Sequence, residues 1–224
     1  MKFLIPGGAG YIGSHMTKYL QALAHEVVVL DDFSTGHEWA VKDCEVLQVN
    51  LLDEEMLTKL LKGRQFDGVI HFAAKSLVGE SVKKPDLYYR NNVVGTLNLV
   101  RQMLRNDINN LVFSSTAAIF GNPVTAKIDE RHPTNPINPY GQSKLIVENI
   151  LRDMCTANRL NATCFRYFNA AGADMSGLIG ETHEPETHLI PNVLKSTLDD
   201  GYTLKVYGDD YDTSDGTCIR DYIH

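Results

Sequence analysis

Residues 3–13 read FLIPGGAGYIG, a short apolar run followed at once by the glycine-rich segment Gly7–Gly13. The segment fits the spacing GxxGxxG from Gly7 and also GxGxxG from Gly8. Glycines are needed where a pyrophosphate comes within hydrogen-bonding distance of backbone N–H groups at the start of a helix, because a side chain would block the approach. The stretch therefore predicts a strand, a tight turn and a helix that together bind a dinucleotide.

An acidic residue, Asp31, ends the next apolar run, VVVLDD, 18 residues after Gly13. A carboxylate at that place accepts hydrogen bonds from both ribose hydroxyls of NAD and repels the 2′-phosphate of NADP. A simple turn cap is the alternative role for Asp31, and the neighbouring Asp32 is able to do either job. The pair of motifs predicts NAD as the cofactor.

Apolar runs and amphipathic segments alternate through most of the chain. The runs resemble strands buried on both faces of a sheet and cover Phe3–Ile5, Val27–Leu30, Glu45–Val49, Gly68–Phe72, Leu111–Ser115 and Thr163–Tyr167. The segments between them favour helices over Tyr11–Leu23, Asp53–Leu61, Asp86–Arg105 and Pro139–Met154. This repeated order predicts the α/β class, with a doubly wound parallel sheet of the Rossmann type.

The composition changes after about Asn169, where glycine, proline and histidine become frequent. We expect a helix near Asn192–Leu198 and a strand near Thr203–Tyr207 in this part. Residues 1–169 are therefore predicted to form an NAD-binding domain, and residues 170–224 part of a smaller C-terminal substrate lobe. The final residues, CIRDYIH, carry no stop signal, so we expect the sequence to be truncated after His224.

The segment NPYGQSK, residues 138–144, places a tyrosine and a lysine four positions apart. Asn138 is a suitable N-cap and Pro139 a suitable first helical residue, so Tyr140 and Lys144 share one helix face. That face continues through apolar positions 147, 151 and 154, which indicates that it points inward. The structural alternative is a core tyrosine beside a surface lysine, and the nearby dinucleotide loop favours catalysis over it.

Tyr140 is the candidate base. A tyrosine has an ordinary pKa near 10, and a neighbouring ammonium together with a positive nicotinamide ring is expected to lower it. Tyr140 would then accept a proton from a substrate hydroxyl. Thr116 follows the fifth predicted strand, at the ligand-facing edge of such a sheet, where its hydroxyl is expected to relay or hold the proton. A turn closed by the Thr116 hydroxyl is the alternative.

Composition argues against several other classes of function. The chain has 21 basic and 28 acidic residues and a formal net charge of -7, so nucleic acid and membranes are not expected partners. The four cysteines lack metal-ligand spacing, which predicts a metal-free protein of the reducing cytoplasm. Glycines interrupt the N-terminal apolar run too early for a signal peptide, and no stretch approaches the roughly 20 apolar residues that span a bilayer.

Six longer segments resemble the nucleotide-sugar epimerases of the extended short-chain dehydrogenase/reductase superfamily, and the UDP-hexose 4-epimerases in particular. They are GGAGYIGSH, HFAAKSLVGESVKKPDLYYRNNVVGT, SSTAAIFG, NPYGQSK, RYFNAAGA and DDYDTSDGTCIRDYIH. The resemblance implies an NAD-dependent isomerase of galactose metabolism that interconverts UDP-galactose and UDP-glucose. Hydride would pass from sugar C4 to tightly bound NAD and return to the other face of a 4-keto intermediate.

The resemblance also implies roles for individual residues. Tyr140 would be the base, Lys144 its tuner and nicotinamide-ribose ligand, and Thr116 the hydroxyl partner. The cofactor contacts are expected at Gly7, Gly10, Tyr11, Ile12, Gly13, Asp31, Asp32, Phe33, Ser34, Thr35, Gly36, Asn50, Leu51, Phe72, Ala73, Ala74, Lys75, Ser76, Asn91, Tyr140, Lys144 and Phe168. The substrate contacts are expected at Thr116, Asn169, His188, Leu189, Tyr207 and Arg220. Tyr207 would lie by the uracil, and Arg220 would pair with a diphosphate oxygen.

The helices expected at Asp86–Arg105 and Pro139–Met154 resemble those that pair in family dimers, which favours a homodimer. Such apolar stripes also serve simply as core, so the oligomeric state stays open. Some members have a lysine where this chain has Ser76, so whether Lys75 or Ser76 faces the nicotinamide stays open. Acceptance of N-acetylated UDP-sugars also stays open.

Other functions remain as alternatives. A nucleotide-sugar 4,6-dehydratase would need an Asp-Glu pair after the threonine, where this chain has Ala117 and Ala118, which cannot transfer protons. Another NAD-dependent nucleotide-sugar epimerase would share every motif described above. A non-catalytic NAD sensor would not need Tyr140 with Lys144, whereas an ordinary dehydrogenase would use both.

Overall fold

The computed structural model describes residues 1–158 and 160–224. Its backbone forms two compact units, Met1–Tyr167 and Phe168–His224. The sequence predicts the division two residues later, between 169 and 170. The two units are described separately.

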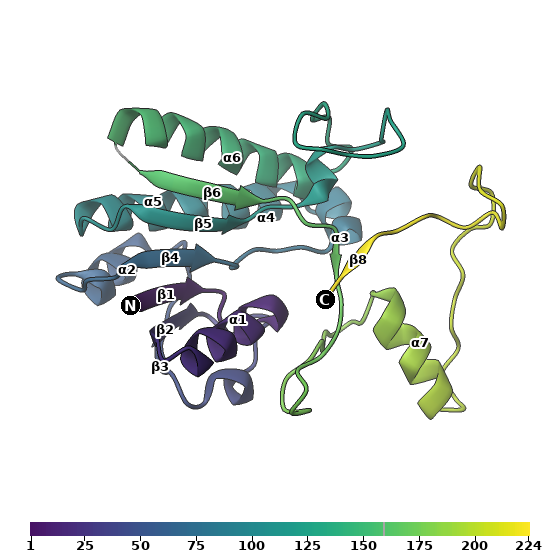
Figure 1. Ribbon diagram of the computed structural model, residues 1–224, viewed down its shortest axis with the longest axis horizontal. Helices are drawn as coiled ribbons and strands as arrows, with labels where there is room; N and C mark the ends of the chain where they lie inside the picture. The colour runs from purple at the N-terminus through teal and green to yellow at the C-terminus, as the bar shows by residue number, and fades with distance from the viewer. Residues whose placement is uncertain (159) are drawn as a thin grey trace. The chain divides into compact units, whose positions relative to one another are not determined.

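The first unit is built on a sheet of six strands in the order β3-β2-β1-β4-β5-β6 (Figure 1). Every neighbouring pair is parallel. The strands are β1 (Lys2–Pro6), β2 (Glu26–Asp31), β3 (Glu45–Gln48), β4 (Gly68–His71), β5 (Asn110–Ser114) and β6 (Asn161–Phe165). The order reverses direction between β1 and β4, as in doubly wound dinucleotide-binding folds. The predicted fold class is therefore confirmed.

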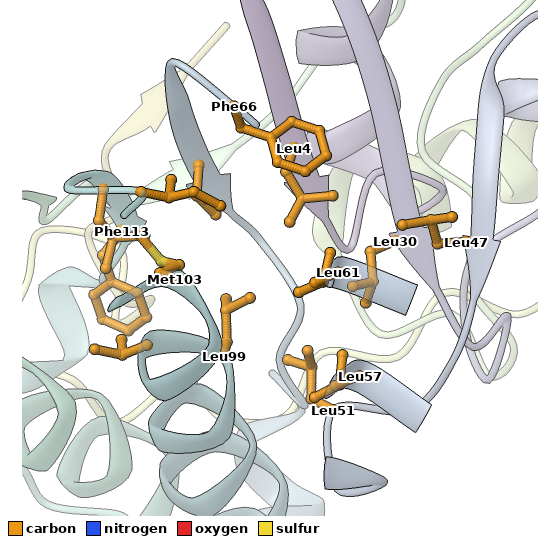
Figure 2. Packing of buried hydrophobic residues seen from close by; sticks show 14 of the residues in the cluster. Leu4, Leu30, Leu47, Leu51, Leu57, Leu61, Phe66, Leu99, Met103 and Phe113 are labelled. Atoms are coloured by element: carbon orange, nitrogen blue, oxygen red, sulfur yellow. The ribbon is translucent and has the colours of Figure 1, made fainter. Parts of the chain in front are cut away.

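Helices cover the sheet on both faces. Leu20 of α1 (Tyr11–Ala22) packs with Ile5 and Val29 on one face. The other face carries α2 (Glu54–Leu61), α5 (Gly95–Arg105) and α6 (Pro139–Asn158), whose apolar side chains join Leu4, Leu30 and Phe113 in the larger cluster (Figure 2). Alternate residues of β1 thus enter different clusters, which is why its sequence is apolar at consecutive positions.

Helix starts follow local sequence signals. The Asn138 side chain accepts a hydrogen bond from Gly141 N at 2.9 Å, immediately before α6. Asp53 caps α2 in the same way through Met56 N at 2.9 Å. These caps satisfy N–H groups that have no partner within the helix. The predicted N-cap Asn138 is therefore confirmed.

The helix predicted over Asp86–Arg105 has three parts. It comprises α4 (Pro85–Tyr88), a π-helical segment labelled η2 (Tyr89–Val94) and α5. A further short helix, α3 (Val78–Lys83), precedes it and was not predicted. The apolar periodicity covers the whole stretch and does not show the change from α to π hydrogen bonding.

On the α1 side, none of the helices in residues 1–158 and 160–224 covers the half of the sheet formed by β4, β5 and β6. A hollow of about 560 Å³ lies there, lined by side chains of β1, β4, β5 and β6 that include Phe3, Ile70, Val112 and Thr163. Phe165, at the end of the edge strand β6, has 54% of its surface exposed. Strand β6 also begins two residues earlier than the predicted Thr163–Tyr167, because polar Asn161 already pairs with Asn110 of β5.

The second unit has little regular structure. Strand β7 (Asn169–Ala170) pairs in parallel with β8 (Tyr222–Ile223). Helix α7 (Leu189–Leu198) starts three residues before the predicted Asn192, because a proline such as Pro191 is tolerated in the first turn of a helix.

The first unit also contains two short 3-10 helices, η1 (Glu38–Val41) and η3 (Ala117–Ile119).

The strand predicted at Thr203–Tyr207 is wrong. No strand is assigned to this stretch, and Val206 and Tyr207 are 75% and 94% exposed. An apolar, extended sequence forms a strand only when another backbone pairs with it, and none of the described strands does so here. Over residues 1–158 and 160–224, none of the helices is both long and apolar enough to cross a membrane.

A buried ion pair ties α6 to the sheet. The Arg166 guanidinium donates to both carboxylate oxygens of Glu148, with Nη2 to Oε2 at 2.6 Å. Ser115, directly after β5, donates to the same carboxylate. Only 8% of the Glu148 side chain and 27% of the Arg166 side chain are exposed. The carboxylate therefore depends on these donors in place of water.

We predict that Arg166→Ala lowers the free energy of unfolding by about 2–4 kcal/mol, because it leaves the Glu148 carboxylate buried without its partner. Urea denaturation of the purified protein measures the change. Arg105→Ala is the matched control: Arg105 also pairs with a glutamate, Glu54, but both side chains are well exposed. Its loss should cost under about 1 kcal/mol. Equal losses for the two variants would contradict the prediction.

Candidate active site

The glycine turn after β1 packs directly against the end of β4. Gly7 has φ +78°, and a Cβ placed on it would lie 2.3 Å from the backbone nitrogen of Ala73. A Cβ on Gly13 would lie 2.0 Å from the carbonyl oxygen of Gly7. Substitution at either position would therefore displace backbone, and the turn is held close to both β4 and α1.

The start of α1 is suited to an anion. Its N-cap is Gly10, which makes no side-chain cap, and the following residues Tyr11 and Ile12 are partly exposed. Backbone N–H groups in the first turn of a helix bind phosphate through hydrogen bonds and the helix dipole. With the tight turn and an acid on the next strand, these residues fit a dinucleotide.

Asp31 holds the loops around the turn. Its Oδ2 accepts a hydrogen bond from Ala9 N and its Oδ1 one from Phe33 N, each at 2.9 Å. The alternative role as a cap is therefore present in the structure. A carboxylate has about four acceptor positions, so two such bonds leave room for ribose hydroxyls. Burial raises the pKa of Asp31, and the two backbone N–H groups oppose that rise.

The segment after Asp31 returns to the glycine turn. His37 N donates to Ala9 O at 3.0 Å, and a Cβ on Gly36 would lie 2.9 Å from Ala9. The Asp32 carboxylate accepts hydrogen bonds from Ser34 N and from the Asn50 side chain. The structure thus brings Asp31 and Gly36 to the glycine turn and Asn50 to Asp32. Phe33, Ser34 and Thr35 lie between Asp32 and Gly36 in the chain, whereas Leu51 packs against Gly95 of α5.

Asn92 fixes the segment after β4. Its side chain accepts from Lys75 N at 2.8 Å and donates to Lys75 O at 3.0 Å, so both backbone groups of Lys75 are bound. The same amide donates to Ser143 Oγ of α6 at 3.0 Å. This segment carries the candidate residues Phe72, Ala73, Ala74, Lys75 and Ser76. Asn91 directly precedes Asn92, and the two hydrogen bonds between Asn92 and the Lys75 backbone are called the Asn92 clamp below. Whether Lys75 or Ser76 faces the nicotinamide stays open.

Thr116 and Tyr140 are linked through their side chains. Thr116 lies directly after β5 and caps η3, where its Oγ1 accepts from Ala118 N at 3.1 Å. Burial raises the pKa of Tyr140 to about 12, and its hydrogen bond with Thr116 opposes that rise. The turn alternative and the contact with the tyrosine therefore both occur for Thr116.

Lys144 is buried one turn further along α6, with 2% of its surface exposed. Its Nζ donates to the carbonyl of Ser114 at 2.8 Å and lies 4.7 Å from the centre of the Phe113 ring. Burial lowers the pKa of Lys144 to about 7. Burial is also the largest cause of the shift at Tyr140, so the pKa of Tyr140 rises, against the expected direction.

A buried histidine, His71, extends the hydrogen-bond network of Asn92. His71 of β4 is fully buried and bonds Thr96 Oγ1 through Nε2 at 2.9 Å. Thr96 in turn donates to the carbonyl of Asn92 at 2.6 Å. Burial, aided by the charge of Lys144, lowers the pKa of His71 to about 3. His71 is therefore a neutral positioning group.

Sequence reasoning missed Asn92, Thr96, Ser143 and His71. Asn92 and Thr96 are the polar residues that break the apolar stripe of the η2–α5 stretch, and His71 stands in an otherwise apolar strand. A polar residue at a core position in an apolar pattern is the signal that would have found them.

The remaining candidate residues lie in the second unit. Asn169 donates through its side chain to Asp221 O at 2.8 Å. His188 is the N-cap residue of α7, and Leu189 is the first residue of that helix. Phe168 is 37% exposed, and Tyr207 and Arg220 are exposed. Within this unit Asn169 lies beside the β8 backbone, and its pairing is local.

Comparison with known proteins agrees with this arrangement. Residues 3–224 match the NAD dependent epimerase/dehydratase family. The chain is 50% identical over 224 residues to the UDP-glucose 4-epimerase of Halalkalibacterium halodurans, covering 100% of this chain and 67% of that protein.

Solved structures give the same result. A crystal structure of UDP-glucose 4-epimerase from Brucella ovis in complex with NAD is 47% identical, with a TM-score of 0.93, over 100% of this chain and 69% of that one. The enzyme from Bifidobacterium longum in complex with NAD+ and UDP is 37% identical, with a TM-score of 0.94, over 100% and 70%. This chain thus spans about two thirds of the length of these relatives. It belongs to the NAD-dependent epimerase/dehydratase family.

Proposed function

We infer that the protein is a UDP-glucose 4-epimerase, an NAD-dependent isomerase that interconverts UDP-galactose and UDP-glucose. The observation that carries the inference is that the side chains of Thr116 and Tyr140 interact, while Ala117 and Ala118 directly follow Thr116. Thr116 and Tyr140 can transfer the proton of one sugar hydroxyl. The two alanines cannot act as the acid–base pair that a 4,6-dehydratase needs to remove water from the sugar. The curated relatives, up to 50% identical over the whole chain, support the same reaction.

We propose that Tyr140 accepts the proton of the sugar 4-hydroxyl, with Thr116 holding that hydroxyl in line. NAD held at this edge would supply a reversible hydride acceptor for C4 of the sugar, so the interconversion would need no net redox. Gly7, Gly10, Gly13 and the first turn of α1 would hold the pyrophosphate, and Asp31 the ribose. Lys144, buried beside Phe113, would raise the phenolate fraction of Tyr140 once its amine is charged.

The buried position of Lys144 gives a reason for the split between its pKa and that of Tyr140. Both groups are neutral over much of the range between about 7 and 12. Neutral side chains cost little free energy to bury, whereas a buried charge needs an opposite charge beside it. A bound positive ring would favour the phenolate, so the protein alone keeps the base protonated until the cofactor is present.

Contacts with the UDP-sugar are proposed at Asn169, His188, Leu189, Tyr207 and Arg220, on the resemblance to the family. A cytoplasmic location and a homodimer are proposed on the same ground. The four cysteines are free, which agrees with a reducing compartment.

The direct test is incubation of the protein with UDP-galactose and NAD, followed by chromatography of the nucleotide sugars. UDP-glucose should form without accumulation of NADH. Steady growth of NADH absorbance in step with product would indicate an ordinary dehydrogenase and overturn the proposal.

Replacement of Tyr140 tests its proposed role as the base. Tyr140→Phe should leave the NAD dissociation constant within about twofold and lower kcat by about 10²–10⁴, the usual contribution of general acid–base catalysis. Tyr167→Phe is the matched control, because it removes a nearby phenol that bonds Ser114. Turnover of Tyr140→Phe within tenfold of wild type would remove Tyr140 from the role of base.

Asp31 tests cofactor choice against loop structure. Asp31→Ala should weaken NAD binding by at least about tenfold and bring the affinities for NAD and NADP closer together, because the charge that repels a 2′-phosphate is lost. Calorimetric titrations with both dinucleotides measure the ratio. A loss of affinity equal for NAD and NADP would mean that Asp31 acts only by holding Ala9 and Phe33.

Lys144 makes stability depend on pH. Its pKa is about 7 in the folded chain against an ordinary 10.5, so between these values the unfolded chain binds more protons and the free energy of unfolding rises with pH. Relative to Lys144→Met, the wild type should gain on the order of 2 kcal/mol between pH 7.5 and 9. Lys59→Met, at an exposed position of α2, should leave the slope unchanged. Parallel curves for wild type and Lys144→Met would contradict the prediction.

A further inference from the structure

A short repeat in the second unit brings four metal-binding side chains together. Residues 181–188 read ETHEPETH, in which Glu-Thr-His occurs twice around Glu184 and Pro185. The two outer residues of each repeat, Glu181 and His183 and then Glu186 and His188, place one ligand atom each within 4.8 Å of the others. The epimerase reaction assigns no role to Glu181, His183 or Glu186.

The separations between these atoms are short and similar. His188 Nδ1 lies 3.0 Å from Glu181 Oε1 and 2.9 Å from Glu186 Oε1. His183 Nδ1 lies 3.6 Å from Glu181 Oε1 and 3.6 Å from Glu186 Oε2. Each imidazole nitrogen thus faces both carboxylates, and the two rings are 4.8 Å apart between centres.

The four histidine–glutamate separations, which involve both oxygens of Glu186, are close to the edges of a zinc coordination shell, and all the ligand atoms lie within 4.8 Å of one another. Zinc binds histidine nitrogen and carboxylate oxygen at about 2.0–2.2 Å, and a tetrahedron of that radius has edges of about 3.3–3.6 Å. The measured separations of 2.9–3.6 Å bracket this range. Small adjustments of the side chains would place all four atoms around one ion.

The backbone already orients one of the ligands. Glu186 Oε1 accepts hydrogen bonds from Thr187 N at 2.8 Å and His188 N at 2.9 Å. The other oxygen, Oε2, faces His183. Such outer hydrogen bonds fix a ligating carboxylate and favour binding of a metal over free rotation.

Charge favours a cation at this place. The Glu181 and Glu186 side chains are 9% and 3% exposed, so two carboxylates are largely removed from water within a few ångströms of each other. One divalent ion bound between the two carboxylates would balance their charge. Imidazole with carboxylate is a donor set typical of zinc and its neighbours, in contrast with the all-oxygen sets of calcium and magnesium.

We propose that Glu181, His183, Glu186 and His188 bind one divalent transition-metal ion of the zinc type. Four protein ligands make a closed site, which is the form of structural sites rather than catalytic ones. The ion would organise the loop that leads into α7. Cysteine spacing alone predicts a metal-free chain, because it takes no account of the histidines and glutamates of this repeat. His188 is also proposed above as a UDP-sugar contact, so the two roles compete at that residue, whereas Glu181, His183 and Glu186 have no proposed part in the epimerase reaction.

Cobalt titration tests the proposal, because Co²⁺ replaces zinc in such sites and absorbs visible light strongly only when its coordination is tetrahedral. Protein without a polyhistidine tag is stripped with EDTA, dialysed and titrated with CoCl₂. One equivalent should give an intense visible band, and one equivalent of ZnCl₂ should remove it. Absence of the band, or a band at several equivalents only, would overturn the proposal.

Two variants and a control localise the binding. His183→Asn and Glu181→Gln should each weaken Co²⁺ binding at least tenfold, whereas Glu184→Gln, a carboxylate of the same loop outside the cluster, should bind like wild type. Circular dichroism and thermal unfolding show whether each variant is folded. Equal Co²⁺ affinity in His183→Asn and Glu184→Gln would place the ion elsewhere and overturn the assignment.

Discussion

A Cβ on Gly7 would lie 2.3 Å from the backbone of Ala73, so the turn after β1 and the end of β4 meet with no side chain between them. That contact brings the glycine turn, Asp31 and the Lys75 segment to one edge of the sheet, where the strand order reverses. Parallel strands present their carboxyl ends on one side, so residues distant in sequence converge there without further design. The network of Asn92 around Lys75 completes this edge from the helical side.

Burial and charge oppose each other throughout the site. His71, Tyr140 and Lys144 are each shifted toward their neutral forms, and in every case burial is the largest cause. Glu148, in contrast, accepts hydrogen bonds from both the Arg166 guanidinium and the Ser115 hydroxyl. The fold thus surrounds one carboxylate with donors, whereas the groups at the candidate site are favoured in their neutral forms by burial.

The sequence predicts the sheet and the reactive residues because both follow local rules. The Gly7–Gly13 spacing, the apolar runs and the Asn138 cap are each encoded within a few positions. Features that rest on distant partners were predicted wrongly or not at all. The strand predicted at Thr203–Tyr207 is wrong because it has no partner among the described strands. The role of Asn92 was missed because its partners Lys75 and Ser143 lie 17 and 51 residues away in the sequence. The direction of the Tyr140 pKa was also missed, since burial is a property of the packed fold.

The π-helical segment Tyr89–Val94 has an evolutionary consequence. A π turn holds one residue more than an α turn, so it arises by a single insertion and rotates the preceding helical residues by about 100° relative to the later ones. Asn91 and Asn92 lie inside it, with Thr96 one turn beyond. Deletion of one residue from the π-helical segment would turn the Asn92 side chain away from Lys75 and so break the Asn92 clamp, while α5 kept its place in the core. The length of this helical stretch is therefore as important for the position of Asn92 as the identity of the residue itself.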